Sequence, residues 1–317
     1  MDSPRQLVDL VRHTSLQPVP PAVKSLVDEI LVLFGNAVEA VLFYGSCLRA
    51  GDDEGGIVDL YVLVDTYRDA YGGGITASLN KLLPPNVFYL EIPFENRRAR
   101  AKYAVLSIVD FERGTSMARF HSYFWARFAQ PTALAYVRSS PIAEKVHAAL
   151  VQALLTFVTR VLPQMASPFC AGDLWRRGFL LSYRSELRAE RPEKILRLFD
   201  AATDYYEQAT RIVARELPFA LQCIRSETPA SYRVDLPKRI CWLNRWQWRL
   251  RIWQGKILSV LRLSKGLSTF RGGVDYILWK IERHSGVHIE LSPRLRRFPW
   301  LGVCVTLWRL FRRGAFR

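Results

Sequence analysis

A Gly-Ser pair followed by a carboxylate is the part of the sequence with the clearest capacity for phosphate chemistry. Gly45 allows a phosphate to approach the backbone closely, and Ser46 adds a hydroxyl donor and an amide at the start of a helix. Asp59, farther along the chain, offers a carboxylate to a divalent metal ion. Together these residues can hold a triphosphate and neutralise its charge, which is what the transfer of a nucleotide requires.

A second metal ligand is less obvious than the first. Residues two apart in a strand face the same side, so the second ligand is expected at position 61, where Tyr61 stands. Asp65 keeps the same parity, but six extended residues place it roughly 20 Å from Asp59. Glu91, on a neighbouring predicted strand, is therefore the better second ligand. The acids of the intervening loop are alternatives: Asp52, Asp53 and Glu54.

Alternating runs of apolar residues predict the elements that must hold these side chains. Strands are predicted at residues 41–44, 57–64, 87–92 and 102–109. Helices are predicted over most of residues 3–36, with a Pro-rich break at 17–21, and over 67–83, 111–130 and 141–162. From residue 171 onward the pattern is almost wholly helical, with helices at 174–188, 192–213, 241–263 and 299–313 and a loop at 229–237.

These elements predict an α/β fold, a mixed sheet flanked by helices, followed by a mostly helical domain and a basic amphipathic C-terminal helix. The corresponding domain limits are 1–165, 166–290 and 291–317. A strand, a Gly-Ser turn and a second strand that begins with an acid are typical of the nucleotidyltransferase fold. The predicted sheet domain is therefore expected to carry the nucleotide chemistry.

Composition restricts the class of protein and where it works. The chain has 317 residues, half of them hydrophobic, which indicates a globular protein. Its five cysteines show no CxxC pairing and fit a reducing compartment. The N-terminal residues do not have the apolar run of a signal peptide, and no run of roughly eighteen apolar residues predicts a membrane span. A cytoplasmic location is expected.

The excess positive charge lies in the last third of the chain. The net charge is +16, and residues 226–317 contain 19 Lys and Arg against 5 Asp and Glu, together with seven of the nine tryptophans. Basic residues interleaved with tryptophan indicate an anionic membrane surface or a nucleic acid, and solvated helix faces over an aromatic core give the same composition. The Trp-rich segment 242–253 is either a membrane contact or a core helix.

The pattern of residues 300–313 favours a membrane surface over the other two interpretations of the basic region. Apolar residues recur there on one face of a helix, and arginines gather at its end. An apolar face that enters the acyl boundary, with arginines at the headgroups, is the pattern of an interfacial helix. The residues expected to contact the membrane are Trp300, Trp308, Arg309, Arg312 and Arg313.

Three segments resemble one known family. LFYGSCLR and IVDLYVLVD resemble the mitochondrial-type phosphatidate cytidylyltransferases (translocator maintenance proteins), which also have YGS followed by a single acid in the next strand. The segment from Ala101 to Tyr136 looks like the family's KYGVIS segment and its downstream neighbours, with Lys102 and Arg127 on matching positions. FLLSYRSELR is similar to a further segment, in which Arg188 matches. The resemblance covers roughly residues 41–199.

The resemblance implies an activity and gives roles to residues. It implies that CTP and phosphatidate react, with Mg²⁺, to give CDP-diacylglycerol and pyrophosphate at the inner face of the cytoplasmic membrane. Asp59 would hold the metal, Lys102 and Arg127 would contact phosphates, and Gly45 and Ser46 would hold the nucleotide. The expected partners are CTP, phosphatidate and an anionic membrane surface, whereas nucleic acid is not expected.

Some residues depart from the family pattern, and other functions compete with it. Ala104 stands in place of the usual Gly, Glu186 in place of Asp and Glu91 in place of Asn. Arg188 would serve the nucleotide or the lipid headgroup. The alternatives are a nucleotidyltransferase with another acceptor and a non-catalytic protein of the same fold that binds membrane or RNA through its basic tail.

Overall fold

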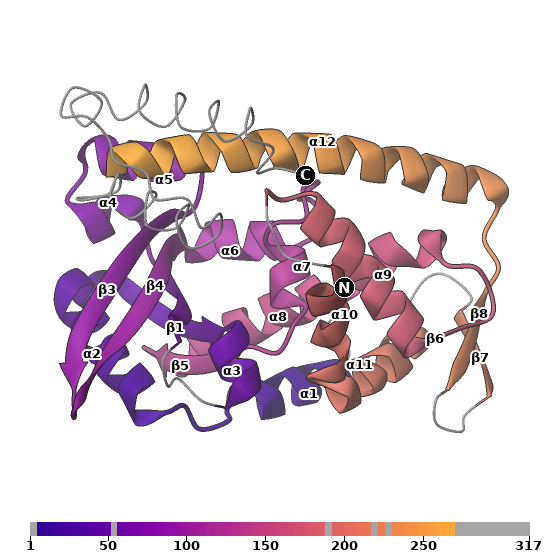
Figure 1. Ribbon diagram of the computed structural model, residues 1–317, viewed down its shortest axis with the longest axis horizontal. Helices are drawn as coiled ribbons and strands as arrows, with labels where there is room; N and C mark the ends of the chain where they lie inside the picture. Colours follow the sequence, from indigo (N-terminus) through magenta and orange to yellow (C-terminus); the bar gives the residue numbers. More distant parts are fainter. Residues whose placement is uncertain (1–4, 52–55, 188–191, 217–220, 226–229, 270–317) are drawn as a thin grey trace. The chain divides into compact units, whose positions relative to one another are not determined.

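The computed structural model describes residues 5–51, 56–187, 192–216, 221–225 and 230–269 (Figure 1). The chain divides into two compact units, Met1–Leu258 and Ser259–Arg317. The elements described below belong to the first unit, except that the last helix, α12 (Lys238–Thr269), continues past Leu258 into the second. The predicted C-terminal helix 299–313 lies outside the described residues.

A mixed five-stranded sheet with flanking helices organises the first unit, so the α/β class is confirmed (Figure 1). The strand order is β3-β4-β2-β1-β5, in which only β2 and β4 are paired in parallel. The strands are β1 (Val38–Tyr44), β2 (Val58–Val64), β3 (Asn86–Phe94), β4 (Arg97–Ser107) and β5 (Ala133–Val137). Strand β4 begins five residues before its predicted start, and β5 was not predicted.

Helices cover both faces of this sheet. One face packs against α2 (Pro21–Phe34), whose buried Val23, Leu26, Val27 and Ile30 have the predicted helical spacing. On the same side, α4 (Tyr67–Tyr71) and α5 (Gly74–Leu82) form the predicted helical connection, with the glycine break between them. The other face packs against α1 (Arg5–Ser15), α6 (Ile108–Thr115), α7 (Trp125–Phe128) and α8 (Ser140–Val161).

The single helix predicted at 111–130 is wrong. Helix α6 ends at Thr115, a loop comes next, and α7 is a separate short helix. Gly114 packs closely against the residue that precedes α7: an added Cβ would lie 2.9 Å from the ring of Phe124. The chain therefore folds back between the two helices, which a single helix over 111–130 would not allow.

Helix α8 is the centre of the larger core. Within the described residues it is the one helix long and apolar enough to cross a membrane, but 72% of its apolar window is buried inside the protein. Phe157 stacks on Trp175 of α9 (Ala171–Arg184), with ring centroids 4.6 Å apart. The core therefore continues from the segment that contains the five-stranded sheet into the helices after residue 165. The domain limits 1–165, 166–290 and 291–317 remain predictions.

The region after residue 165 is mainly helical but also contains a small sheet. Its helices are α9, α10 (Pro192–Asp200), α11 (Thr203–Glu216) and α12 (Lys238–Thr269). The three-stranded sheet has the order β6-β8-β7, with β6 (Phe169–Cys170), β7 (Leu221–Arg225) and β8 (Ser231–Val234). Strand β8 lies inside the predicted loop 229–237. Strands this short give no detectable alternation in a sequence.

A buried histidine joins α1 to α8. The Nε2 atom of His147 lies 2.8 Å from the hydroxyl of Ser15, and His147 is 4% exposed. Burial, aided by Arg12 and opposed by Glu144, lowers the pKa of His147 below its ordinary value. Because the charged form is disfavoured in the folded state, His147 contributes stability that is full above about pH 6.5 and is lost as the pH falls through the lowered pKa.

We therefore expect wild-type protein to lose more thermal stability between about pH 7 and about pH 5 than the His147→Gln variant does. Glutamine can still hydrogen-bond to Ser15 but cannot take up a proton in this range. Melting temperatures of both proteins across the pH range measure the difference. Equal losses in the two proteins would show that His147 does not contribute to the pH dependence.

Candidate functional site

The turn after β1 brings the Gly-Ser pair against Asp59. Gly45 has φ 91° and ψ −156°, a conformation that favours glycine, and it caps the short helix α3 (Ser46–Ala50). A Cβ added at Gly45 would lie 2.7 Å from Asp59 Oδ2. The predicted loop thus contains the short helix α3, and Asp59 packs against Gly45, the residue that precedes this helix.

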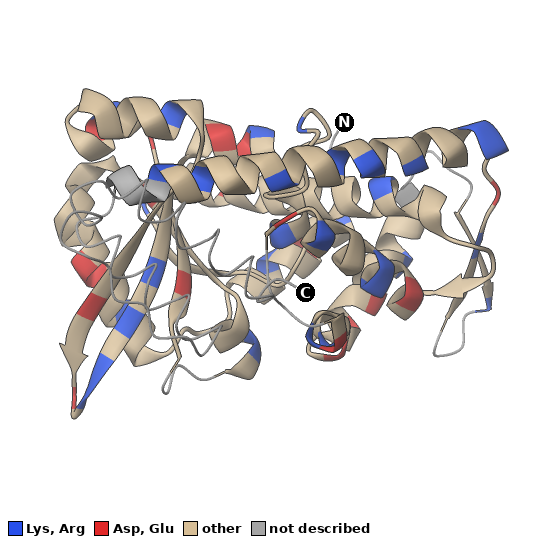
Figure 2. Cartoon of the chain, turned by 45° about the horizontal axis from the view of Figure 1, so that its top comes forward, with Lys and Arg blue, Asp and Glu red and all other residues tan. Residues whose placement is uncertain are grey.

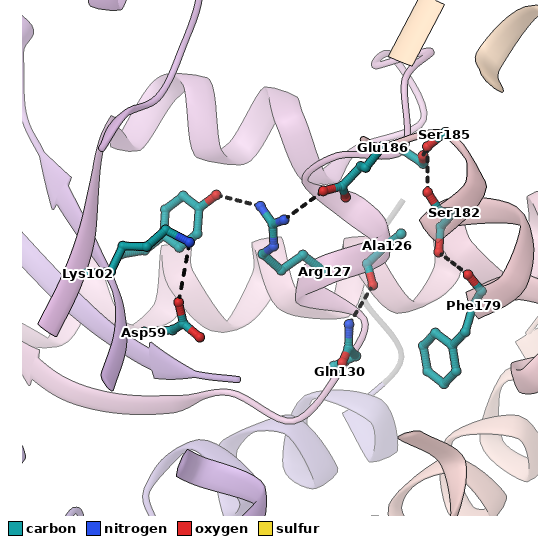
Figure 3. Close-up of polar contacts among 11 residues, drawn as sticks. Asp59, Lys102, Ala126, Arg127, Gln130, Phe179, Ser182, Ser185 and Glu186 are labelled. Carbon is teal, nitrogen blue, oxygen red and sulfur yellow. Dashed lines mark hydrogen bonds and ion pairs between the residues drawn. The ribbon is translucent and has the colours of Figure 1, made fainter. Parts of the chain in front are cut away.

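Lys102 lies beside Asp59 because β2 and β4 run in parallel. Their register pairs Asp59 with Lys102, and the ammonium nitrogen is 3.7 Å from Asp59 Oδ1 (Figure 3). The side chains of Asp59 and Lys102 are 28% and 39% exposed, so solvent and solutes can reach both. The structure therefore brings together three of the residues selected from the sequence: Gly45, Asp59 and Lys102.

Tyr61, at the position expected for a second acid, points to the same face of the sheet as Asp59 but is fully buried. Its hydroxyl oxygen accepts a hydrogen bond of 2.9 Å from Arg127 Nη1. Burial raises the pKa of Tyr61 well above the ordinary value, with Arg127 acting in the opposite direction. Tyr61 is therefore a neutral phenol at physiological pH and offers no charge to a metal ion.

Arg127 connects the sheet to the helices. Its Nη2 atom donates to Glu186 Oε2 at 3.2 Å, and its guanidinium lies 4.2 Å from the ring centroid of Tyr123. Burial by itself would lower the pKa of Arg127, but the tyrosine oxygens and Glu186 raise it well above the ordinary value. Because the tyrosines are neutral at pH 7, Glu186 supplies the compensating charge.

Arg127 is thus engaged within the protein rather than extended toward solvent. Its side chain is 8% exposed, and Nη1 and Nη2 donate to Tyr61 and Glu186. Its expected contact with a substrate phosphate stays a prediction. In the described arrangement Arg127 holds the sheet face and the end of α9 together.

The structure does not bring Glu91 close to Asp59. Glu91 lies on the edge strand β3 opposite Arg100, two strands away from Asp59 and two residues farther along. Standard sheet spacings give a separation of roughly 12 Å, too far to share a metal ion. Glu91 instead accepts hydrogen bonds from Tyr89 at 2.7 Å and Arg98 at 2.8 Å, which lower its pKa.

Asp65 does not join Asp59 either. It comes directly after the last residue of β2, is exposed, and its backbone N–H donates to Ala37 at 3.0 Å. Strand β2 is continuous between the two acids, so the predicted separation along the strand holds. Among the described residues no group of three or more His, Cys, Asp or Glu is arranged to hold a metal ion.

Several contacts around the site had no signal in the sequence. Arg49 of α3 donates to Gln130 at 3.4 Å, which ties the Gly-Ser turn to the segment after α7. The hydroxyls of Ser122 and Ser185 lie 2.6 Å apart, next to the Glu186 that binds Arg127. These partners are separated by 81 and 63 residues, so only the folded chain brings them together.

Gly45 can be tested against a glycine of nearly identical backbone conformation. Gly73 has φ 89° and ψ −155°, but a Cβ there meets nothing within 4 Å. For the nucleotidyl transfer proposed below, we expect Gly45→Ala to lower kcat about a hundredfold, because the added methyl group displaces Asp59. Gly73→Ala introduces only the backbone strain. Turnover and melting temperature of both variants separate the two effects. A similar loss of turnover in both variants would exclude a specific role for the contact with Asp59.

The remaining predicted residues lie outside the described part of the chain. They are Arg188, the loop acids at 52–54, and the membrane residues Trp300, Trp308, Arg309, Arg312 and Arg313. No family model matches the chain, and no curated protein matches it.

Proposed function

We propose that this protein is a nucleotidyltransferase that makes CDP-diacylglycerol and pyrophosphate from CTP and phosphatidate. The observation that carries the proposal is the close packing of Asp59 under the Gly45 turn, with the Lys102 ammonium 3.7 Å away. A carboxylate, a glycine turn and a cation at one accessible point are the parts that nucleotidyl transfer requires. The nucleotidyltransferase fold itself is part of this proposal.

In the proposed reaction a phosphate oxygen of phosphatidate attacks the α-phosphorus of CTP. The new P–O bond forms as the bond from the α-phosphorus to the bridging oxygen of the β-phosphate breaks, and that oxygen leaves with pyrophosphate. The attacking phosphate is already ionised, so no protein base has to remove a proton. Tyr61, a neutral phenol in place of the usual second acid, is compatible with such an acceptor.

The residues of the site would act mainly by position and charge. Gly45, which has no Cβ, lets Asp59 lie directly against the turn that would hold the triphosphate, and Ser46, an exposed residue, would donate its hydroxyl to a phosphate oxygen. Lys102, beside Asp59, would neutralise charge on the phosphates that react. Arg127 would hold the face of the sheet on which Asp59 lies, through its hydrogen bond to Tyr61.

The residues present fit a magnesium ion that arrives with the nucleotide. Mg²⁺ in such enzymes is bound by one or two carboxylates and by substrate phosphates, and Asp59 supplies one partly exposed carboxylate. When bound, the ion would draw electron density from the phosphoryl oxygens and so favour attack at phosphorus. The role of this chain is to hold Asp59 in place through the pairing of β2 with β1 and β4.

A lipid substrate requires contact with a membrane surface. The sequence of residues 300–313, with Trp300, Trp308, Arg309, Arg312 and Arg313, supports an interfacial helix on an anionic surface. The proposed location is the inner face of the cytoplasmic membrane, where CTP is available.

The proposal is tested by supplying the purified protein with each labelled nucleoside triphosphate in turn, Mg²⁺ and phosphatidate vesicles. We expect a lipid-linked nucleotide with CTP and release of pyrophosphate in equal amount. Transfer to another acceptor in place of phosphatidate would establish the chemistry but overturn the substrate. If no triphosphate is consumed with any acceptor, the protein is not a nucleotidyltransferase.

A further inference from the structure

One side of helix α12 packs against the rest of the first unit. Up to Leu258 the stripe on this side consists of Asn244, Trp248, Arg251 and Gly255, which recur at steps of four, three and four residues and are all buried. An added Cβ at Gly255 would lie 2.2 Å from the backbone oxygen of Ser185, so the helix backbone packs closely on the end of α9.

Specific hydrogen bonds fix the rotation of the helix about its axis. The indole nitrogen of Trp248 donates to the backbone oxygen of Arg160 at 3.0 Å, and Arg251 Nε donates to that of Phe120 at 2.6 Å. The Arg251 guanidinium also lies 4.5 Å from the ring centroid of Trp248. The side of α12 opposite this stripe therefore faces away from the rest of the first unit.

The outward side carries an apolar stripe, which we call the tryptophan face. Its members recur at steps of four, four, three and four residues, which places them on one side of an α-helix. They are Trp242, Trp246, Leu250, Trp253 and Ile257, with exposed fractions of 57%, 46%, 56%, 67% and 40%. Large exposed apolar residues that form a continuous stripe mark an interaction surface, whereas isolated ones do not.

Positive charge accompanies this face. Exposed basic residues on the same part of α12 are Lys238, Arg239, Arg245, Arg249 and Lys256. No Asp or Glu occurs anywhere in α12, so its polar surface has a single sign of charge (Figure 2). The Arg249 guanidinium lies 4.8 Å from the ring centroid of Trp246, at the border of the apolar stripe. Basic residues that attract negative charge therefore lie next to the tryptophan face, which gains from an apolar environment.

We infer that the tryptophan face lies in the interfacial region of an anionic lipid bilayer. Tryptophan favours the boundary between headgroups and acyl chains, and Lys and Arg beside it favour anionic headgroups. This chemistry matches three tryptophans, two aliphatic residues and neighbouring cations on one exposed helix side. The inference concerns the lipid surface itself and does not depend on the proposed transfer reaction.

The composition of the stripe favours a bilayer over a nucleic acid. Single strands bind through aromatic rings on which bases stack, between cations that track the backbone. Leu250 and Ile257, at 56% and 40% exposure, offer no stacking plane, and Leu250 lies between Trp246 and Trp253. Both gain from entry into an acyl layer.

The test is co-flotation of the full chain with vesicles of phosphatidylcholine alone or with added phosphatidylglycerol. Neither lipid is the proposed substrate, so binding reports the surface alone. We expect binding to the anionic vesicles, and a loss of at least about tenfold in affinity for the Trp242→Ala, Trp246→Ala, Trp253→Ala variant. Removing the charge at Arg245 and Arg249 with Gln should weaken binding about fivefold per residue, on anionic vesicles only.

A matched control uses exposed apolar residues elsewhere in the first unit. Val32, Ile75 and Leu82 are 78%, 77% and 82% exposed, and their triple Ala variant should keep wild-type affinity. Repeating the tryptophan substitutions together with Trp300→Ala and Trp308→Ala separates this face from the proposed tail helix. We expect the α12 substitutions to lower vesicle affinity both in wild-type protein and in the Trp300→Ala, Trp308→Ala protein.

Other occupants of the face would overturn the inference through distinct results. A dimer that the tryptophan variant abolishes would assign the face to a second copy. The emission of Trp242, Trp246 and Trp253 is the difference between the wild-type and variant spectra; if this difference is blue-shifted without vesicles and unchanged by them, the face is assigned to residues 270–317. Affinity for RNA that falls in the tryptophan variant, with vesicle binding unchanged, would assign it to nucleic acid. Equal flotation of variant and wild type, or no flotation of either, would also overturn it.

Separate measurements of vesicle binding and of turnover distinguish a failure of the proposed enzyme function from a failure of the proposed membrane contact. Asp59→Asn protein should bind vesicles as wild type does, whatever its activity. The tryptophan variant should retain turnover on dispersed short-chain phosphatidate while losing turnover on vesicles. Vesicle binding that depends on the tryptophans, in a protein without transferase activity, would leave this inference standing and remove only the proposed function.

Discussion

Replacing Asp59 by Asn should lower kcat for the proposed formation of CDP-diacylglycerol by at least about a thousandfold, because it removes the charge that would hold a metal ion on the phosphates. Asparagine has nearly the same shape, and the Asp59 side chain is 28% exposed, so folding should be little affected. Steady-state turnover with CTP and phosphatidate measures the loss, and circular dichroism checks the fold.

Glu112→Gln provides the control for this substitution. Glu112 is an exposed carboxylate on α6, and its loss should leave turnover within about twofold of wild type, as surface substitutions usually do. Turnover that persists in Asp59→Asn protein would mean that the carboxylate under the Gly45 turn does not take part in the reaction. The proposed mechanism would then have to be abandoned.

Removing the Arg127 guanidinium should have the largest effect on stability. Arg127→Met removes the cation that lies 3.2 Å from Glu186, which is 15% exposed, and the group that donates to the buried Tyr61 hydroxyl at 2.9 Å. Breaking a buried ion pair from one side costs about 3–5 kcal/mol in free energy of unfolding. Urea unfolding of wild type and variant measures this difference.

A double-mutant cycle separates the ion pair from packing. Glu186→Gln removes the charge but keeps a hydrogen-bond acceptor for Arg127, and should cost less than Arg127→Met. The double variant should be more stable than the sum of the single losses predicts, because neither charge is then buried alone. Additive losses would show that Arg127 and Glu186 do not interact energetically.

The main parts of the sheet were predictable because local patterns encode them. Runs of β-branched and aromatic residues identified β1, β2 and β3, and the helical spacing of apolar residues in α2 identified that helix and its buried face. Strand β5, ALAYV, was missed because its two alanines weaken the strand signal. The parallel pairing of β2 with β4 depends on long-range packing, which no local pattern contains.

The candidate site was predictable only in part, for the same reason. Gly45 and Asp59 lie at the same end of one antiparallel pair of strands, so local order already placed them together. Lys102 came from the family resemblance. The expectation that Glu91 lies near Asp59 required a strand order, and β4 intervenes between the two strands. Nothing local could show that Tyr61 is buried and accepts a hydrogen bond from Arg127.

The Arg127 bridge limits how this protein can be divided or recombined. Tyr61 on the sheet and Glu186 after α9 share the same guanidinium, and each receives a hydrogen bond from it. A sheet segment exchanged without the α9 segment, or the reverse, would break this three-residue set and lose one of its hydrogen bonds. Productive chimaeras should therefore cross over outside residues 61–186, so that the whole bridge descends from a single parent.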